Sequence, residues 1–197
     1  ANGVMGRPVI ADPEITEVNQ AFLEYHAPGG TTLAAGRQEF KLADQRFFGT
    51  VGWRQNHQSF EAFRVNVKNI PKTTVTYAFL NRSNRINGGE WEQESHVLDI
   101  AIKACKKGTL APYYYQQDFD SQAGGASPST TTIGARWGAS TEAGDWKLPY
   151  HLEYAQQKDT GNNPNNLDAH YYRATIGGHR GGLRLKLGYE MLGGDSV

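Results

Sequence analysis

The segment GGLRLKLGYEML, residues 181–192, decides the fold because its apolar and polar side chains alternate without a break. In an extended chain one face carries the apolar residues Leu183, Leu185, Leu187, Tyr189 and Met191. The residues between them, Arg184, Lys186, Gly188 and Glu190, fall on the opposite face. A period of two indicates a β-strand with one apolar and one polar face. The same alternation recurs in FRVNVK (63–68), TVTYAFL (74–80) and LPYHLEYAQ (148–156), so we predict an all-β protein.

About ten segments of this kind are predicted along the chain. They cover roughly 15–27, 31–41, 58–68, 73–82, 93–104, 109–119, 130–140, 147–157, 168–178 and 182–191. Strands in globular proteins usually have about 5–6 residues. A tilted strand that crosses a bilayer needs about 9–11 residues, which is close to the length of most of these segments.

The predicted connections alternate between short and long. Short turns are expected at 27–30, 69–72, 105–108, 141–145 and 178–181, and longer loops at 42–57, 83–92, 120–129 and 158–167. In an antiparallel up-and-down meander this places all short turns at one end, which is typical of outer-membrane barrels. A β-sandwich also needs one apolar face per sheet, but its strands are shorter and its connections do not alternate in this way. We therefore favour part or all of a transmembrane β-barrel.

The composition fits one β domain over residues 1–197. Hydrophobic residues make up 38% of the chain and the mean hydropathy is −0.62, yet aromatic residues reach 11%, too many for a disordered segment. Lys plus Arg and Asp plus Glu balance at 20 each, and no basic run argues for a nucleic-acid partner. The single cysteine, Cys105, excludes an internal disulfide framework.

Four blocks of the sequence resemble the alginate-export family of outer-membrane β-barrels from Gram-negative bacteria. They are DPEITEVNQAFLEY (12–25), LAAGRQEFKLADQRFFGTVGWRQNHQSFEAFRV (33–65), YYYQQDFD (113–120) and GLRLKLGYEMLGGD (182–195). The elements GRQ at 36–38, QRF at 45–47 and GWRQN at 52–56 carry most of the specificity.

The resemblance implies a porin-like barrel of more than ten strands in the bacterial outer membrane. Its lumen would pass an anionic uronic-acid polysaccharide such as alginate, or smaller anions, by passive diffusion. Its partners would be this cargo, outer-membrane lipid, and periplasmic or export proteins. The family continues with further strands beyond GYEMLGGD, so we expect this chain to be a segment of a larger barrel.

The aromatic and arginine residues of 46–65 point to a loop at the barrel mouth. We expect its aromatic side chains to pack against the wall while Arg46 and Arg54 face the channel. A guanidinium suits carboxylate ligands because it offers paired donors in a fixed plane and stays charged. The alternative is that these arginines only brace neighbouring backbone or acidic residues.

Charged residues of the strands are expected to line the lumen. By alternation this predicts lumen positions for Arg37, Arg64, Lys68, Arg136, Arg173, Arg184 and Lys186, with Glu39, Asp118, Glu153 and Glu190 among them. A water-filled lumen needs polar walls, so a generic solvated lining would explain each of these residues by itself. Only a cluster of positive charge would argue for anionic cargo. Acidic residues beside the arginines would help to release the cargo, because permeation needs binding that is weak enough to reverse.

The sequence gives no sign of an enzyme, a cofactor or a metal. Asp118 and Asp120 supply too few oxygens for calcium, which takes six to eight. The six histidines have no HExxH spacing, and neither a GxSxG elbow nor a phosphate loop occurs. We therefore predict a channel, and the alternative is a soluble or self-assembled β-sheet protein with a carbohydrate-binding or structural role.

Overall fold

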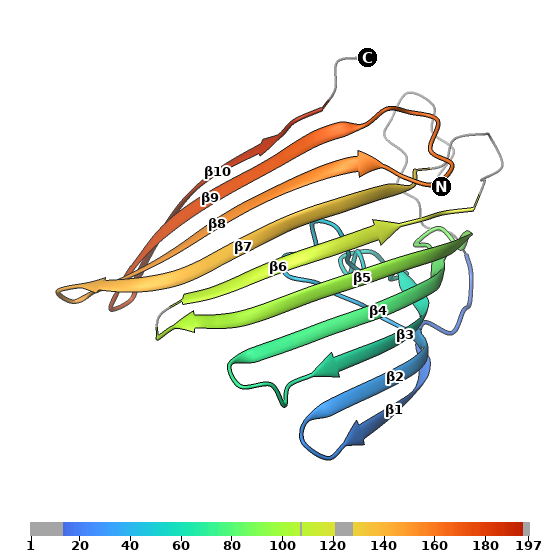
Figure 1. Ribbon diagram of the computed structural model, residues 1–197, viewed down its shortest axis with the longest axis horizontal. Helices are drawn as coiled ribbons and strands as arrows, with labels where there is room; N and C mark the ends of the chain where they lie inside the picture. The colour runs from blue at the N-terminus through green and yellow to red at the C-terminus, as the bar shows by residue number, and fades with distance from the viewer. Residues whose placement is uncertain (1–13, 107, 121–127, 195–197) are drawn as a thin grey trace.

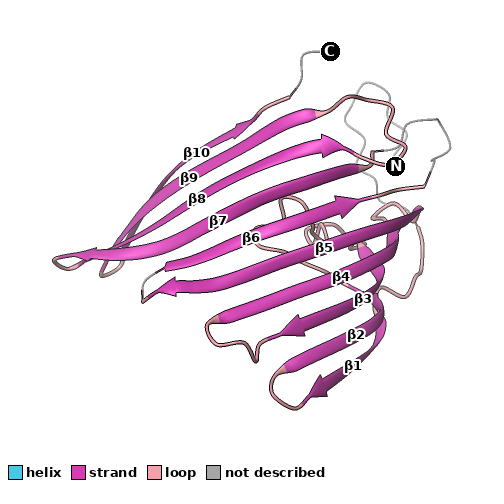
Figure 2. Ribbon diagram, viewed as in Figure 1, coloured by secondary structure: helices cyan, strands magenta, loops and turns pink. Residues whose placement is uncertain are grey.

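The computed structural model describes residues 14–106, 108–120 and 128–194. Its ten strands form one antiparallel, curved sheet in chain order (Figures 1 and 2). The strands are β1 (Ala21–Ala27), β2 (Thr31–Gln38), β3 (Ser59–Val67), β4 (Thr73–Asn84), β5 (Glu90–Cys105), β6 (Gly108–Gln117), β7 (Thr130–Ala143), β8 (Trp146–Asp159), β9 (Asp168–Arg180) and β10 (Leu183–Leu192). The predicted all-β up-and-down meander is confirmed. No helix of the described residues is long and apolar enough to cross a membrane.

The connections gather by length at the two ends of the sheet. The short turns lie together at the left of Figure 1, and the connections 85–89 and 160–167 lie at the right. The prediction of a long loop at 83–92 is wrong, because β4 and β5 continue their pairing and leave only 85–89 between them. Most of the expected loop at 120–129 lies outside the described residues.

The outer face of the sheet carries the apolar alternation. Registers place Leu187 opposite Ile176 and Leu152 opposite Ala174 on this face. Leu187 keeps 73% of its surface exposed. The described residues form a single sheet, so nothing in them packs against this face as a sandwich would require. The sandwich arrangement is therefore wrong for this part of the chain.

The inner face holds the buried residues. The hydrophobic core cluster contains Phe60 of β3, Leu80 of β4, Val97 of β5 and Tyr115 of β6, and it is completed by residues that follow β2. That connection, residues 39–58, overlaps the middle of the sheet in Figure 1 instead of projecting from its end. We call residues 39–58 the inward segment.

Candidate functional site

The inward segment is held on the sheet by two neighbouring phenylalanines. Phe48 is 2% exposed, and its ring centroid lies 5.4 Å from that of Tyr115 in an edge-on arrangement. The Phe47 ring lies 5.8 Å from Tyr113 and 6.0 Å from Tyr171. Aromatic pairs at these separations contribute beyond the area that they bury. The aromatics therefore pack on the inner face, where they join the core, and not only at a barrel mouth.

Ion pairs fix the same segment to the last two strands. Asp44 pairs with Arg173 of β9, and Arg46 pairs with Glu190 of β10. Tyr171 donates a hydrogen bond to Glu190 at 2.8 Å, and the Arg46 guanidinium lies 5.3 Å from the Tyr171 ring centroid. Charged hydrogen bonds across more than 120 residues of sequence thus join the inward segment to the far side of the sheet.

The base of the inward segment is closed by Glu39. Its carboxylate contacts His57 Nδ1 at 2.8 Å, Lys41 Nζ at 3.1 Å and Asn19 Nδ2 at 2.9 Å. The hydrogen bond with His57 lowers the pKa of the Glu39 carboxyl, and Lys41 and Asn19 add to that shift. Because Glu39 and His57 flank the segment, this contact ties its two ends together.

A cavity of about 470 Å³ lies between the inward segment and strands β6 to β10. Three cationic side chains line it, Arg136 of β7, Arg173 of β9 and Lys186 of β10, together with His151 of β8. Asp44 of the inward segment also lines it, as do small residues such as Ala111 and Thr175. We call this cavity the basic pocket. It brings three cationic side chains together on the inner face.

Cross-strand register explains why the charges meet there. Arg136 lies opposite Glu153, Glu153 opposite Arg173, and Arg173 opposite Glu190, so charge alternates along one row over β7 to β10. Opposite charges directly across a strand pair stabilise a sheet. The row therefore sets the positions of the guanidinium groups that border the basic pocket.

A hydrogen-bond network holds Arg136 rigidly. Its guanidinium pairs with Asp99, donates to the Tyr115 hydroxyl at 3.2 Å, and lies 4.6 Å from the Tyr113 ring centroid. Tyr113 in turn donates to Glu153 at 3.0 Å. A cation fixed in this way costs little further ordering when it meets an anion.

His151 offers a polar atom to the basic pocket. Its Nδ1 is buried and has no hydrogen-bond partner among the described residues. A buried polar group without a partner is costly, and a ligand or water can satisfy it. The described residues contain no group of three or more His, Cys, Asp or Glu side chains that could hold a metal ion. The arrangement is suited to holding an anion with polar substituents.

The structure brings together three of the predicted lumen residues, Arg136, Arg173 and Lys186. The other members of that prediction lie elsewhere. Arg64 faces inward near Glu24, 3.6 Å away, Lys68 lies beside the β3–β4 turn, and Arg184 is near the turn end of β10. Asp118 lies at the opposite end of the sheet, against Gly161.

The two loop arginines differ from each other. Arg46 is paired with Glu190, so it braces an acidic residue as in the alternative interpretation. Arg54 lies over the exposed ring of Trp53, with its guanidinium carbon 4.1 Å from the ring centroid. Neither residue lines the basic pocket, and their role in binding cargo stays a prediction.

The expectation that Arg37 faces the lumen is wrong. Arg37 shares the face of Leu33 and Ala35 on β2, which is the outer face, and it donates to Glu61 of β3 at 2.6 Å. The physical reason is the period of two, which turns residues 33, 35 and 37 to the same side whatever their charge.

Sequence reasoning missed several residues of the site, namely Asp44, Asp99, Tyr113, Tyr115 and His151. A signal existed for the tyrosines and the histidine, because Tyr113, Tyr115 and His151 alternate with outward residues in their strands. No sequence signal marks Asp44, since its contact with Arg173 spans 129 residues.

Comparisons with known proteins agree with this architecture. The sequence matches the alginate export family over residues 6–191. The comparison with curated proteins gave no match.

Solved structures of outer-membrane proteins share the fold at low sequence identity. OccK1 (OpdK) of Pseudomonas aeruginosa has a TM-score of 0.67 and 16% identity over 84% of this chain and 45% of that chain. A BenF-like porin from Pseudomonas fluorescens Pf-5 has a TM-score of 0.67 and 15% identity over 84% of this chain and 44% of that chain.

OccAB4 of Acinetobacter baumannii has a TM-score of 0.66 and 15% identity over 84% of this chain and 42% of that chain. The chain thus spans less than half the length of these solved structures. It belongs to the alginate export family, and its ten strands are part or all of a transmembrane β-barrel of the bacterial outer membrane.

Proposed function

We propose that this chain forms part of the wall of an outer-membrane channel for passive diffusion of carboxylate anions. The cargo class includes the uronic acids of an anionic polysaccharide such as alginate and smaller carboxylates. The observation that carries the proposal is the basic pocket, where Arg136, Arg173 and Lys186 border one cavity on the inner face. No covalent step is part of this function.

The geometry supports reversible binding of an anion. Arg173 and Arg136 each have an acidic partner, Asp44 and Asp99, so an arriving carboxylate meets cations whose charge is already partly compensated. Permeation requires a site that is favourable enough to enter and weak enough to leave. Lys186, which lines the same pocket from β10, adds a flexible point charge.

A structural relative offers chemical support. OpdK of Pseudomonas aeruginosa, with 16% identity to this chain, has been solved with vanillate, a carboxylate. At this identity the likeness concerns the fold, so we take from it only the class of ligand that a channel of this architecture accommodates.

The proposal is tested by conductance of the full-length protein in planar bilayers. Anion-over-cation permeability comes from the reversal potential in a salt gradient, and affinity comes from block of the current by glucuronate. One unit charge about 4 Å from a carboxylate in water contributes roughly 1 kcal/mol. Lys186→Gln should therefore weaken glucuronate block about fivefold and lower the anion preference.

The matched control is Arg184→Gln, which removes a cation from the same strand and face but outside the basic pocket. It should change block by less than twofold. Equal effects of the two substitutions would mean that the lining is generic, and an absence of conductance in the unmodified protein would refute the channel itself.

A further inference from the structure

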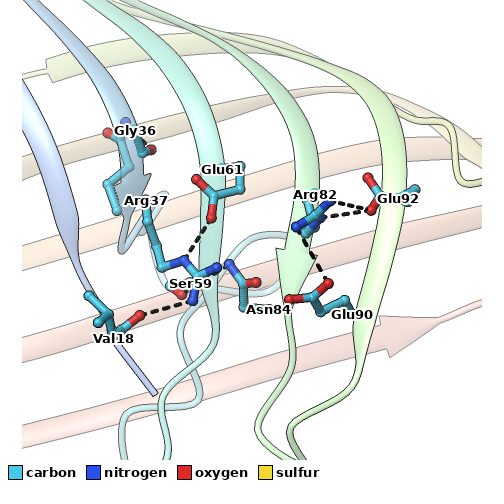
Figure 3. Close-up of polar contacts among 10 residues, drawn as sticks. Val18, Gly36, Arg37, Ser59, Glu61, Arg82, Asn84, Glu90 and Glu92 are labelled. Atoms are coloured by element: carbon cyan, nitrogen blue, oxygen red, sulfur yellow. Dashed lines mark hydrogen bonds and ion pairs between the residues drawn. The ribbon is translucent and has the colours of Figure 1, made fainter.

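A second alternating charge row lies on the outer face of the sheet. Arg37 of β2 is opposite Glu61 of β3, Glu61 is opposite Arg82 of β4, and Arg82 is opposite Glu92 of β5. Figure 3 shows the side chains of this row side by side across four strands. We call these four residues the outer charge row. It contains the arginine of the GRQ element, for which the channel function gives no role.

The members of the outer charge row neutralise one another. Arg37 Nε donates to Glu61 at 2.6 Å, and Arg37 Nη1 donates to the Val18 carbonyl at 3.0 Å. Arg82 Nη2 lies 2.6 Å from Glu92, and Arg82 Nη1 lies 3.4 Å from Glu90 (Figure 3). The four members of the row therefore have no net charge, and Glu90 adds one carboxylate beside Arg82.

The row borders the apolar surface directly. On β3 the next outward residues after Glu61 are Phe63 and Val65, and on β2 the outward residues before Arg37 are Ala35 and Leu33. Phe63 is 43% exposed. The change from apolar to charged side chains therefore occurs between one residue of the outer face and the next. It lies at the strand ends that are joined to the inward segment and to the 85–89 connection.

Aromatic–histidine pairs lie on the apolar side of this border. The Tyr77 hydroxyl is 2.9 Å from His96 Nδ1 on β4 and β5, and the two rings stack. The pair recurs on the other half of the sheet, where the Tyr154 hydroxyl is 3.0 Å from His170 Nδ1 on β8 and β9. Amphipathic rings of this kind concentrate at membrane–water interfaces.

Polar groups also lie beyond the second pair, along the strands toward the longer connections. Gln156 donates to Asp168 at 2.6 Å, and Lys158 lies 3.6 Å from Asp168, both just beyond Tyr154 on β8. The same order, from aliphatic to aromatic–histidine to charged, therefore appears on both halves of the sheet. Two separate strand pairs thus place the border at the end with the longer connections.

We propose that the outer charge row lies in the polar headgroup layer of the outer leaflet and fixes the depth of this wall in the membrane. An arginine on the lipid face of a barrel is most costly at the midplane, and the cost nearly vanishes at the interface. Longer loops mark the extracellular end of such barrels, which assigns the row to the outer leaflet. Because its charges are already paired, hydration rather than the charge of the lipid positions the row.

The test uses lipid-borne quenchers with the full-length protein in vesicles. Cys105 is first replaced by Ser, and single cysteines are introduced at the outward positions Glu61, Phe63 and Val67 of β3 for labelling with an environment-sensitive fluorophore. Lipids carry a nitroxide either at the headgroup or at mid-chain. We expect the label at position 61 to be quenched at least twofold more by the headgroup nitroxide, and the label at position 67 to show the reverse.

Control labels distinguish the depth of the row in the membrane from the effect of removing one of its charges. Because Glu61→Cys leaves Arg37 without its partner, Gln156→Cys provides a second reading beside Asp168 on the other half of the sheet without removing a charge, and it should also be quenched more by the headgroup nitroxide. A label at the inward position Arg64 should respond to aqueous iodide and to neither lipid. The pattern should be the same with phosphatidylcholine vesicles and with vesicles that contain phosphatidylglycerol.

Three results would overturn the inference. Strongest mid-chain quenching at positions 61 and 156 would place the row in the hydrocarbon. Quenching there by iodide alone would place it above the membrane or under another protein. A profile that moves with lipid charge would show that headgroup charge, and not hydration, sets the depth.

Discussion

Replacing Phe48 by alanine should release the inward segment from the sheet. Phe48 is 2% exposed and contacts Phe40, Phe60 and Tyr115. Truncating a buried phenylalanine costs about 3–5 kcal/mol. At the lower value, and at about 1.4 kcal/mol for each factor of ten, the open fraction of the segment should rise on the order of a hundredfold.

Limited trypsin digestion of the folded full-length protein measures this opening, because the segment carries cleavable bonds after Lys41, Arg46 and Arg54. Cleavage tracks the open population when the segment closes faster than the protease cuts. The matched control is Trp53→Ala in the same segment, since Trp53 is 76% exposed and its loss should change cleavage after Lys41 less than threefold. The reasoning is refuted if the Phe48 and Trp53 variants are cut at the same rate while both keep heat-modifiable gel mobility.

Two further predictions concern the same face. The pKa of Glu39 is lowered in the folded protein, so its stabilising contact with His57 is present above the ordinary glutamate pKa of about 4.3 and is lost as the pH falls through the lower folded value. Cleavage of the inward segment by an acid-active protease should therefore rise steeply below about pH 4, and Glu39→Gln should flatten that rise. On β7, a Cβ at Gly134 would lie 2.4 Å from the Tyr113 ring, whereas a Cβ at Gly138 would meet only His151 at 3.9 Å. Gly134→Ala should thus lower the unfolding temperature by several degrees more than Gly138→Ala, and equal melting of the two variants would contradict the described packing of Tyr113.

Most of the fold could be predicted from the alternation of apolar and polar residues in the sequence. The alternation predicted ten strands, their antiparallel order and the outward face of β10, because alternation is a local property of an extended chain. It failed where pairing continued past a polar stretch, as at β4 and β5, since hydrogen bonds between strands and not composition decide where a strand ends.

The site was much less accessible to sequence reasoning. Arg136, Arg173 and Lys186 could each be named as inward residues, but that they border one cavity depends on the register of four strands. The inward position of residues 39–58 depends on Phe47 and Phe48 reaching tyrosines more than sixty residues later in the chain. Contacts between residues so far apart in the chain produce no periodic pattern in the sequence.

A comparison of the two charge rows shows what the sequence decided and what the tertiary structure decided. Arg136–Glu153–Arg173–Glu190 and Arg37–Glu61–Arg82–Glu92 have the same alternating chemistry, and the sequence by itself assigned the arginines of both to strands. The sequence placed the arginines of the first row and Arg37 of the second row on the inner side alike, and only the tertiary structure showed that the second row faces the outer surface. The reason is that a strand fixes which residues share a face, whereas packing against the inward segment decides which of the two faces is inside.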